Sequence, residues 1–138
     1  MKYLLDTDVI SQASKPNPDA DVTRWISTIT KADAAISVIT IQEIRSGLEL
    51  MPSGKCRLGF ELWLENSVLP SFSGQILDVD AEIADVCGRL VASARKQGHN
   101  PDLGDALIAA TAKVHGLDRK STRLNSSHES TSRMPSSA

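Results

Sequence analysis

The stretch YLLDTDVIS (residues 3–11) places two carboxylates, Asp6 and Asp8, directly after the first apolar run of the chain. An acid that follows a strand is common in turns, where its side chain hydrogen-bonds the nearby backbone. It can also line a ligand site, because open α/β sheets bind ligands at the carboxyl ends of their strands. The choice between these interpretations depends on whether other acids converge on Asp6.

Apolar runs alternate with amphipathic segments along the rest of the chain. Short apolar runs at residues 2–5, 34–39 and 75–80 predict strands, and helical periodicity predicts helices over 22–29, 40–51, 55–70, 81–98 and 102–117. Strands that alternate with helices are typical of a parallel sheet. The sequence therefore predicts an α/β fold.

Length and composition limit the possible classes of protein. A chain of 138 residues is one domain with room for a core, and a net charge of −2 provides no overall basic surface, so nucleic-acid binding would need a local patch. The two cysteines, Cys56 and Cys87, lie far apart without metal-binding spacing, which favours reduced thiols. Neither a signal peptide nor an apolar run of membrane length is visible, so we expect a cytoplasmic protein.

The segment from 118 to 138 differs from the rest in composition. It is rich in serine, lacks periodicity and contains almost no apolar residues, which predicts disorder. In addition, DRKSTRLNSSH and SRMPSSA match, in order, the translation of a sequencing-library adapter. We therefore expect a domain at residues 1–117 and a non-native, adapter-derived tail at 118–138.

Three acids lie at predicted element boundaries: Asp6 after the first strand, Glu43 in the helix after the second, and Asp105 at the start of the last helix. Carboxylates drawn together repel one another unless a cation joins them, and a site made of few oxygen ligands suits Mg²⁺ or Mn²⁺. Helix capping is the competing explanation, with Thr40 and Glu43 as a capping box and Asp102 as the N-cap of the last helix. Spacing alone leaves both open.

Three segments together resemble the PIN-domain family, specifically VapC-type toxins and their FitB-like relatives. These are YLLDTDVIS, SVITIQEIRSGLELM and DLGDALIAATAKVHGL, which appear in the family's order and spacing. The segment ILDVDAEIADVCGRLVASARKQG is similar to the matching part of FitB-like members. The resemblance covers nearly all of residues 1–117 and implies a PIN-like three-layer α/β/α fold.

The resemblance also implies a function. It suggests a Mg²⁺- or Mn²⁺-dependent endoribonuclease that hydrolyses RNA phosphodiester bonds and is the toxin of a type II toxin–antitoxin system. The implied partner is a VapB- or FitA-like antitoxin, and the implied assembly is a homodimer. The family's acids fall on Asp6, Glu43 and Asp105, which would be both metal ligands and catalytic groups. Thr7 falls where the family has a hydroxyl beside the metal, and Asp8 would support the site or its turn. Asp102 is expected to be a local cap.

The sequence departs from the family after Leu117. The family continues there with a strand, a turn that carries a fourth acid, and a last strand, whereas this chain continues with the adapter-like segment. We therefore expect two C-terminal strands to be missing. The first strand would keep an exposed edge, and the truncated chain would be an impaired nuclease of low solubility.

Two other functional classes remain open. LLDTDVI is close to the strand-end motif of aspartyl phosphotransferases, with Asp6 as nucleophile and Asp8 as acid and base, although Ala109 stands where a second acid of that family is needed. The third possibility is a catalytically dead remnant that still binds an antitoxin. Phosphate release from phosphomonoesters would identify the phosphotransferase class. Metal-dependent RNA cleavage would exclude the catalytically dead remnant.

Overall fold

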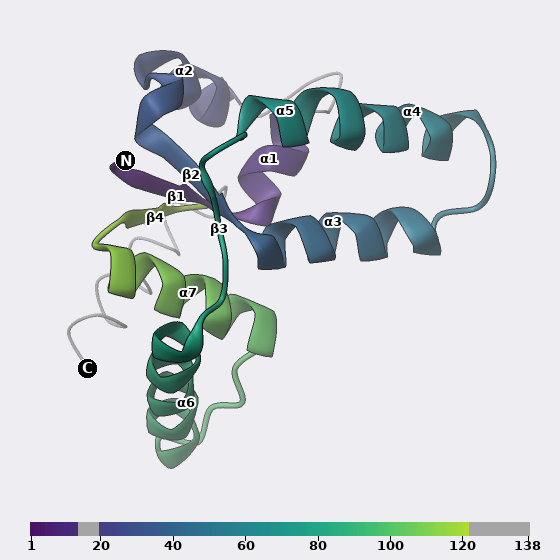
Figure 1. Cartoon of the computed structure of the whole chain (residues 1–138). Helices are drawn as coiled ribbons and strands as arrows, with labels where there is room; N and C mark the ends of the chain where they lie inside the picture. The colour runs from purple at the N-terminus through teal and green to yellow at the C-terminus, as the bar shows by residue number, and fades with distance from the viewer. Residues whose placement is uncertain (14–19, 122–138) are drawn as a thin grey trace.

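A four-stranded sheet lies between two layers of helices in the computed structural model, which describes residues 1–13 and 20–121 (Figure 1). The strand order is β3-β2-β1-β4, and each neighbouring pair is parallel. The strands are β1 (Tyr3–Leu5), β2 (Ala34–Ser37), β3 (Ile76–Leu77) and β4 (Asp118–Lys120). The predicted PIN-like α/β fold with a parallel sheet is therefore confirmed.

Helices connect the strands, as the sequence periodicity predicts. The described part of the chain holds no helix that is long and apolar enough to cross a membrane. Near the N-terminus lie α1 (Thr7–Ala13), α2 (Ala20–Thr28) and the 3-10 turn η1 (Lys31–Asp33). After β2 come α3 (Val38–Leu50), α4 (Lys55–Trp63), the π-helical turn η2 (Leu64–Val68), α5 (Leu69–Ser71), α6 (Ala81–Lys96) and α7 (Leu103–His115).

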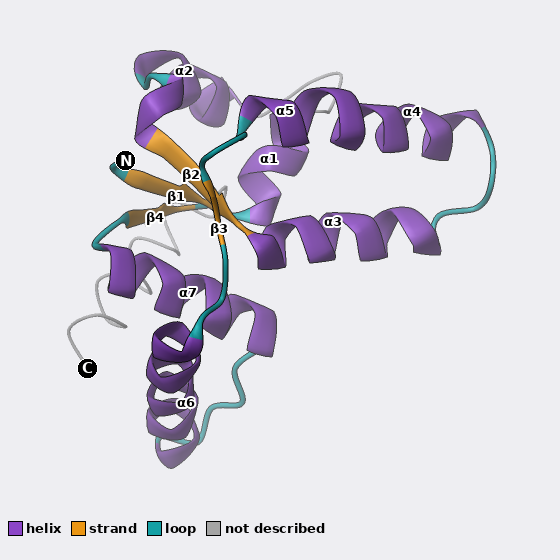
Figure 2. Cartoon of the chain, in the orientation of Figure 1, coloured by secondary structure: helices purple, strands orange, loops and turns teal. Residues whose placement is uncertain are grey.

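Side-chain alternation along the strands explains the three layers. Leu4 and Ala35 pack with Ile108 of α7 on one face of the sheet, and α6 packs behind α7. Leu5 and Ile36 belong to a second core on the opposite face, which contains residues of α1, α3 and η2. Successive strand residues point to opposite faces, so each short strand serves both cores. Figure 2 shows the strands at the centre with helices on both sides.

The prediction that β1 has an exposed edge is wrong. β4 lies beside β1 and pairs Tyr3 with Asp118, Leu4 with Arg119 and Leu5 with Lys120. The strand forms within a charged sequence because ladder hydrogen bonds use the backbone N–H and C=O groups that every residue except proline carries. The strand expected to be missing beside β1 is thus present, and the premise for an aggregation-prone edge is removed.

The predicted tail is therefore only partly described. Its residues 118–120 form β4, and Ser121, which follows, is buried. Residues 122–138, which include most of the adapter-like sequence, lie outside the described residues. The adapter origin of the tail and the absence of a further strand remain predictions.

Two truncations separate the contribution of β4 from that of the rest of the tail. Removal of 118–138 exposes the edge of β1 and should lower the melting temperature or abolish cooperative melting, because buried backbone groups lose their partners at about 1–3 kcal/mol each. Removal of 122–138 should leave the melting temperature within about 2 °C, since composition predicts no packing there. Thermal melting followed by circular dichroism tests both. Equal melting of the two shortened chains would contradict the role given to β4.

Candidate metal centre

Asp6 directly follows β1, at the carboxyl edge of the sheet, and is only 5 % exposed. Its Oδ1 accepts a hydrogen bond from the backbone N–H of Thr7 at 2.7 Å. Its backbone carbonyl accepts one from the backbone N–H of Val9, in the first turn of α1, at 3.1 Å. The backbone N–H of Asp6 donates to the carbonyl of Lys120 at 2.8 Å. The carboxylate is therefore held by the junction of strand and helix, and not by a loose surface turn.

Glu43 lies in α3, and the predicted capping box around it is wrong. The N-cap of α3 is Ser37, whose hydroxyl accepts the N–H of Ile39 at 3.0 Å, so the helix begins three residues earlier than expected. Thr40 is then buried inside the helix, and Glu43 lies beyond its first turn. Capping therefore does not explain Glu43. Instead, Thr7 donates its hydroxyl proton to Oε1 of Glu43 in a short hydrogen bond.

The start of α7 supplies two further carboxylates. Asp102 is the N-cap, as predicted, and its Oδ2 accepts the N–H of Asp105 at 3.1 Å. Gly104 lies between them, where a Cβ atom would be 2.8 Å from Oε2 of Glu43 and 3.1 Å from Oδ2 of Asp102. The absence of a side chain at this position allows α3 and α7 to bring their carboxylates together.

The resulting cluster has the donor set of a metal site. One carboxylate oxygen from each of Glu43, Asp102 and Asp105 lies within 4.8 Å of the others. Asp6 adjoins this group, since one guanidinium nitrogen of Arg119 contacts both its carboxylate and that of Asp105. Hard divalent cations prefer oxygen ligands of this kind, so the residues fit a divalent ion. The sequence predicted Asp102 only as a helix cap, because cap spacing gives no sign that its carboxylate also lies close to that of Glu43.

The surroundings of Glu43 change the pKa of its carboxyl. Burial raises the pKa of its carboxyl, the hydrogen bond from Thr7 lowers it, and the charges of Asp105, Asp6 and Asp102 raise it further; the net shift is upward. A raised carboxyl pKa means that this environment disfavours the negative charge. A bound cation would reverse that preference.

Two residues beyond Leu117 complete the surroundings of the acids. Arg119 contacts Asp6 and Asp105, and the hydroxyl of Ser121 donates to Oδ2 of Asp8 at 2.7 Å. Asp8 thus ties α1 to the end of β4 and supports the turn. Sequence reasoning missed both residues because their segment was assigned to the tail; only the register of a strand beside β1 could have indicated them.

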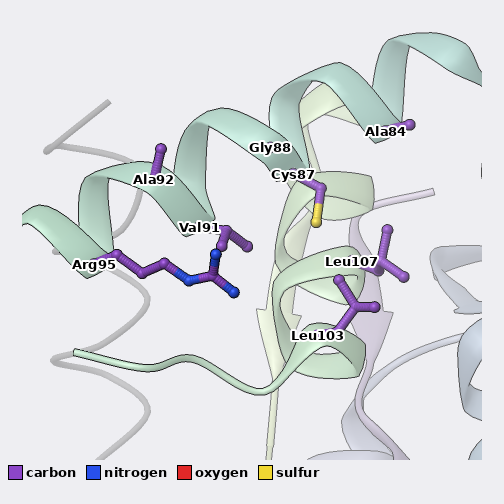
Figure 3. Close-up of a pocket in the computed structure, with 8 residues that line it drawn as sticks. All are labelled: Ala84, Cys87, Gly88, Val91, Ala92, Arg95, Leu103 and Leu107. Carbon is purple, nitrogen blue, oxygen red and sulfur yellow. The ribbon is translucent and has the colours of Figure 1, made fainter.

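A hollow of about 710 Å³ lies elsewhere, between α6 and α7 (Figure 3). It contains no carboxylate, and most of its wall is apolar, so it does not coincide with the acid cluster. Its lining residues are Ala84, Cys87, Gly88, Val91, Ala92, Arg95, Leu103 and Leu107.

Comparison with known proteins identifies the family of the chain. A family model described as "PIN domain" matches residues 3–122. The chain belongs to the PIN-domain family. Toxin FitB of Neisseria gonorrhoeae is 38 % identical over 114 residues, which cover 83 % of this chain and 82 % of that protein. VapC ribonuclease Y4jK of Sinorhizobium fredii is 40 % identical over 114 residues, which cover 83 % and 81 %.

A solved structure extends the comparison to the fold. The crystal structure of FitAcB from Neisseria gonorrhoeae superposes with a TM-score of 0.78 at 37 % identity and covers 85 % of this chain and 84 % of that one. The chain is thus a homologue of the VapC/FitB toxin ribonucleases. Solved structures of such relatives include toxin–antitoxin complexes with FitA or VapB antitoxins.

The raised pKa of Glu43 predicts a pH-dependent effect of Glu43→Gln in metal-free protein. The raised value means that ionisation of Glu43 costs stability, and this loss develops as pH rises from the ordinary value of 4.5 through the folded-state pKa. At pH 7 with a chelator, Glu43→Gln should therefore melt at a higher temperature than the parent. The difference should disappear below pH 4.5, where the parent is protonated in both states. Glu65→Gln, at an exposed ion pair with Arg45, is the control; a lower melting temperature for Glu43→Gln at pH 7 would contradict the argument.

Gly104→Ala tests the close approach of α3 and α7. The new methyl group would push the carboxylate of Glu43 away, so Mn²⁺ affinity measured by calorimetry should fall about tenfold or more. The fold should survive, because Glu43 is flexible and alanine is the better helix former by about 0.8–1 kcal/mol. Gly47→Ala in α3, where nothing lies within 4 Å of the new atom, is the matched control. Equal Mn²⁺ affinity in the two variants would contradict the proposed need for glycine.

Proposed function

We propose that the protein is a Mg²⁺- or Mn²⁺-dependent endoribonuclease, the toxin component of a type II toxin–antitoxin system. The observation that carries the proposal is the group of carboxylates from Glu43, Asp102 and Asp105, with Asp6 linked to Asp105 through Arg119, in a homologue of a VapC ribonuclease. Isolated acids on helix ends need no ligand, whereas acids from the end of β1, from α3 and from α7 that meet in one place repel one another, and a bound cation would relieve that repulsion.

The proposed metal ligands are Asp6, Glu43 and Asp105, with an oxygen of Asp102 close enough to join them. A bound Mg²⁺ or Mn²⁺ would supply an activated water and neutralise charge that develops on the RNA phosphodiester. The chain's own groups prepare the site before the ion arrives. Thr7 orients Glu43 through its hydroxyl and Asp6 through its N–H, and burial of Asp6 restricts access of bulk water to that carboxylate.

The partners follow from the same family membership. RNA is the proposed substrate, a VapB- or FitA-like antitoxin is the proposed protein partner, and the cytoplasm is the proposed site of action. We also propose a homodimer. Exposed leucines on α3 and α4, at Leu50, Leu58 and Leu62, provide apolar surface that a protein partner could cover.

Cleavage of RNA by the full chain tests the proposal. Activity should require Mg²⁺ or Mn²⁺ and stop with a chelator, and Asp6→Asn should lower the rate about a hundredfold, because an amide lacks the charge that the cation needs. Asp85→Asn, at an exposed ion pair with Arg89 on α6, should leave the rate unchanged.

Other outcomes of this experiment identify the competing classes. Cleavage that continues under chelator would overturn the metal-dependent mechanism. Phosphate release from small phosphomonoesters, with no RNA cleavage, would indicate the phosphotransferase class. Metal binding without cleavage of any RNA tested would leave an antitoxin-binding remnant as the better explanation.

A further inference from the structure

Arg119 extends from β4 into the acid cluster and occupies the carboxylate of Asp6. Its Nη2 donates to Oδ2 of Asp6 at 2.7 Å and its Nε donates to the same oxygen at 3.1 Å. Nη2 also contacts Oδ1 of Asp105 at 3.4 Å, and Nη1 donates to the backbone carbonyl of Asp105 at 3.3 Å. The side chain of Arg119 is 17 % exposed and that of Asp6 is 7 % exposed, so the contact is largely shielded from water.

These contacts leave little of Asp6 available to another cation. Each carboxylate oxygen offers two lone pairs, and both of those on Oδ2 face N–H groups of Arg119. The other oxygen, Oδ1, already accepts the N–H of Thr7. A divalent ion that takes Oδ2 as a ligand must therefore displace the guanidinium, and the two positive charges would also repel each other.

We propose that Arg119 competes with a divalent ion for the carboxylate of Asp6. Arg119 neutralises part of the charge of Asp6 and Asp105 when no ion is present, and must swing away for Oδ2 of Asp6 to bind one. The inference rests on the proposed metal site. It concerns the 138-residue chain as it stands, whatever the origin of the segment that contains Arg119.

The neighbouring residue on β4 provides a matched control. Lys120 carries the same charge one position along the strand, so its side chain points to the opposite face of the sheet. Its Nζ lies 5.7 Å from the ring centroid of Tyr3, 5.6 Å from that of Trp25 and 3.0 Å from Oδ2 of Asp118. Loss of this charge alters the strand's net charge by the same amount without touching the acid cluster.

Mn²⁺ binding to the full chain, measured by calorimetry or by electron paramagnetic resonance, tests the proposal. Arg119→Gln should bind Mn²⁺ about tenfold more tightly than the parent, equivalent to about 1.4 kcal/mol, and Lys120→Gln should bind as the parent does. Arg119→Lys should lie between the parent and Arg119→Gln, because a compact ammonium cannot reproduce the forked contacts of a guanidinium. Adding Asp6→Asn to Arg119→Gln should remove the gain.

Thermal melting separates competition from a merely structural role. With a chelator, Arg119→Gln should melt below the parent, because the carboxylates lose their cation. The rise in melting temperature on adding Mn²⁺ should nevertheless be larger for Arg119→Gln, since an ion stabilises the fold in proportion to the logarithm of its affinity. An arginine that only braces the fold would lower the melting temperature in both conditions and leave the affinity unchanged.

Two observations together would overturn the inference. The parent binds Mn²⁺ at a site that Glu43→Gln abolishes, and Arg119→Gln binds Mn²⁺ no more tightly than the parent. In that case the metal site stands and the competition does not. If neither the parent nor Arg119→Gln and Arg119→Lys binds Mn²⁺, both the inference and the proposed metal site fail.

Discussion

Mutual repulsion among carboxylates is the constraint around which this fold is arranged. Asp6, Glu43 and Asp105 come from β1, α3 and α7, which are far apart in sequence, yet the fold brings them to one edge of the sheet. Burial and the nearby like charges together disfavour the ionised form of Glu43 and raise its pKa. The arrangement persists because hydrogen bonds, helix ends and a guanidinium offset part of that cost.

Local backbone geometry supplies much of the offset. The N-terminal turn of α7 favours negative charge at Asp102 and Asp105 through its N–H groups and dipole. The glycine between them lets α3 approach without a clash. Each of these features has an ordinary structural purpose, and their combination concentrates oxygen ligands in one place. The same combination of oxygen ligands would favour a bound cation.

The sequence predicted the layers well because they depend on local pattern. Apolar runs such as AAIS at residues 34–37 can bury both faces only between two helical layers, which defines the α/β fold. Asp6 and Asp105 adjoin clear strand and helix signals, so their approximate place follows from topology. The start of α3 was misplaced because Thr40 and Glu43 fit a capping box as well as Ser37 fits an N-cap, and tertiary contacts decided between them.

What the sequence could not predict is pairing that depends on the backbone alone. Asp118, Arg119 and Lys120 have poor strand propensity, and composition assigns them to a tail. Without β4, the backbone N–H and C=O groups on one side of β1 would be unpaired. A charged segment after Leu117 can satisfy them, because the ladder requires no particular side chain. Once the backbone pairs, alternation along the strand determines which side chains face the acids. Leu4 pairs with Arg119, so a long cation at that register reaches Asp6, whereas the next residue packs against Tyr3 and Trp25. The electrostatic state of the candidate site is therefore set by the register of one short strand as much as by the acids themselves.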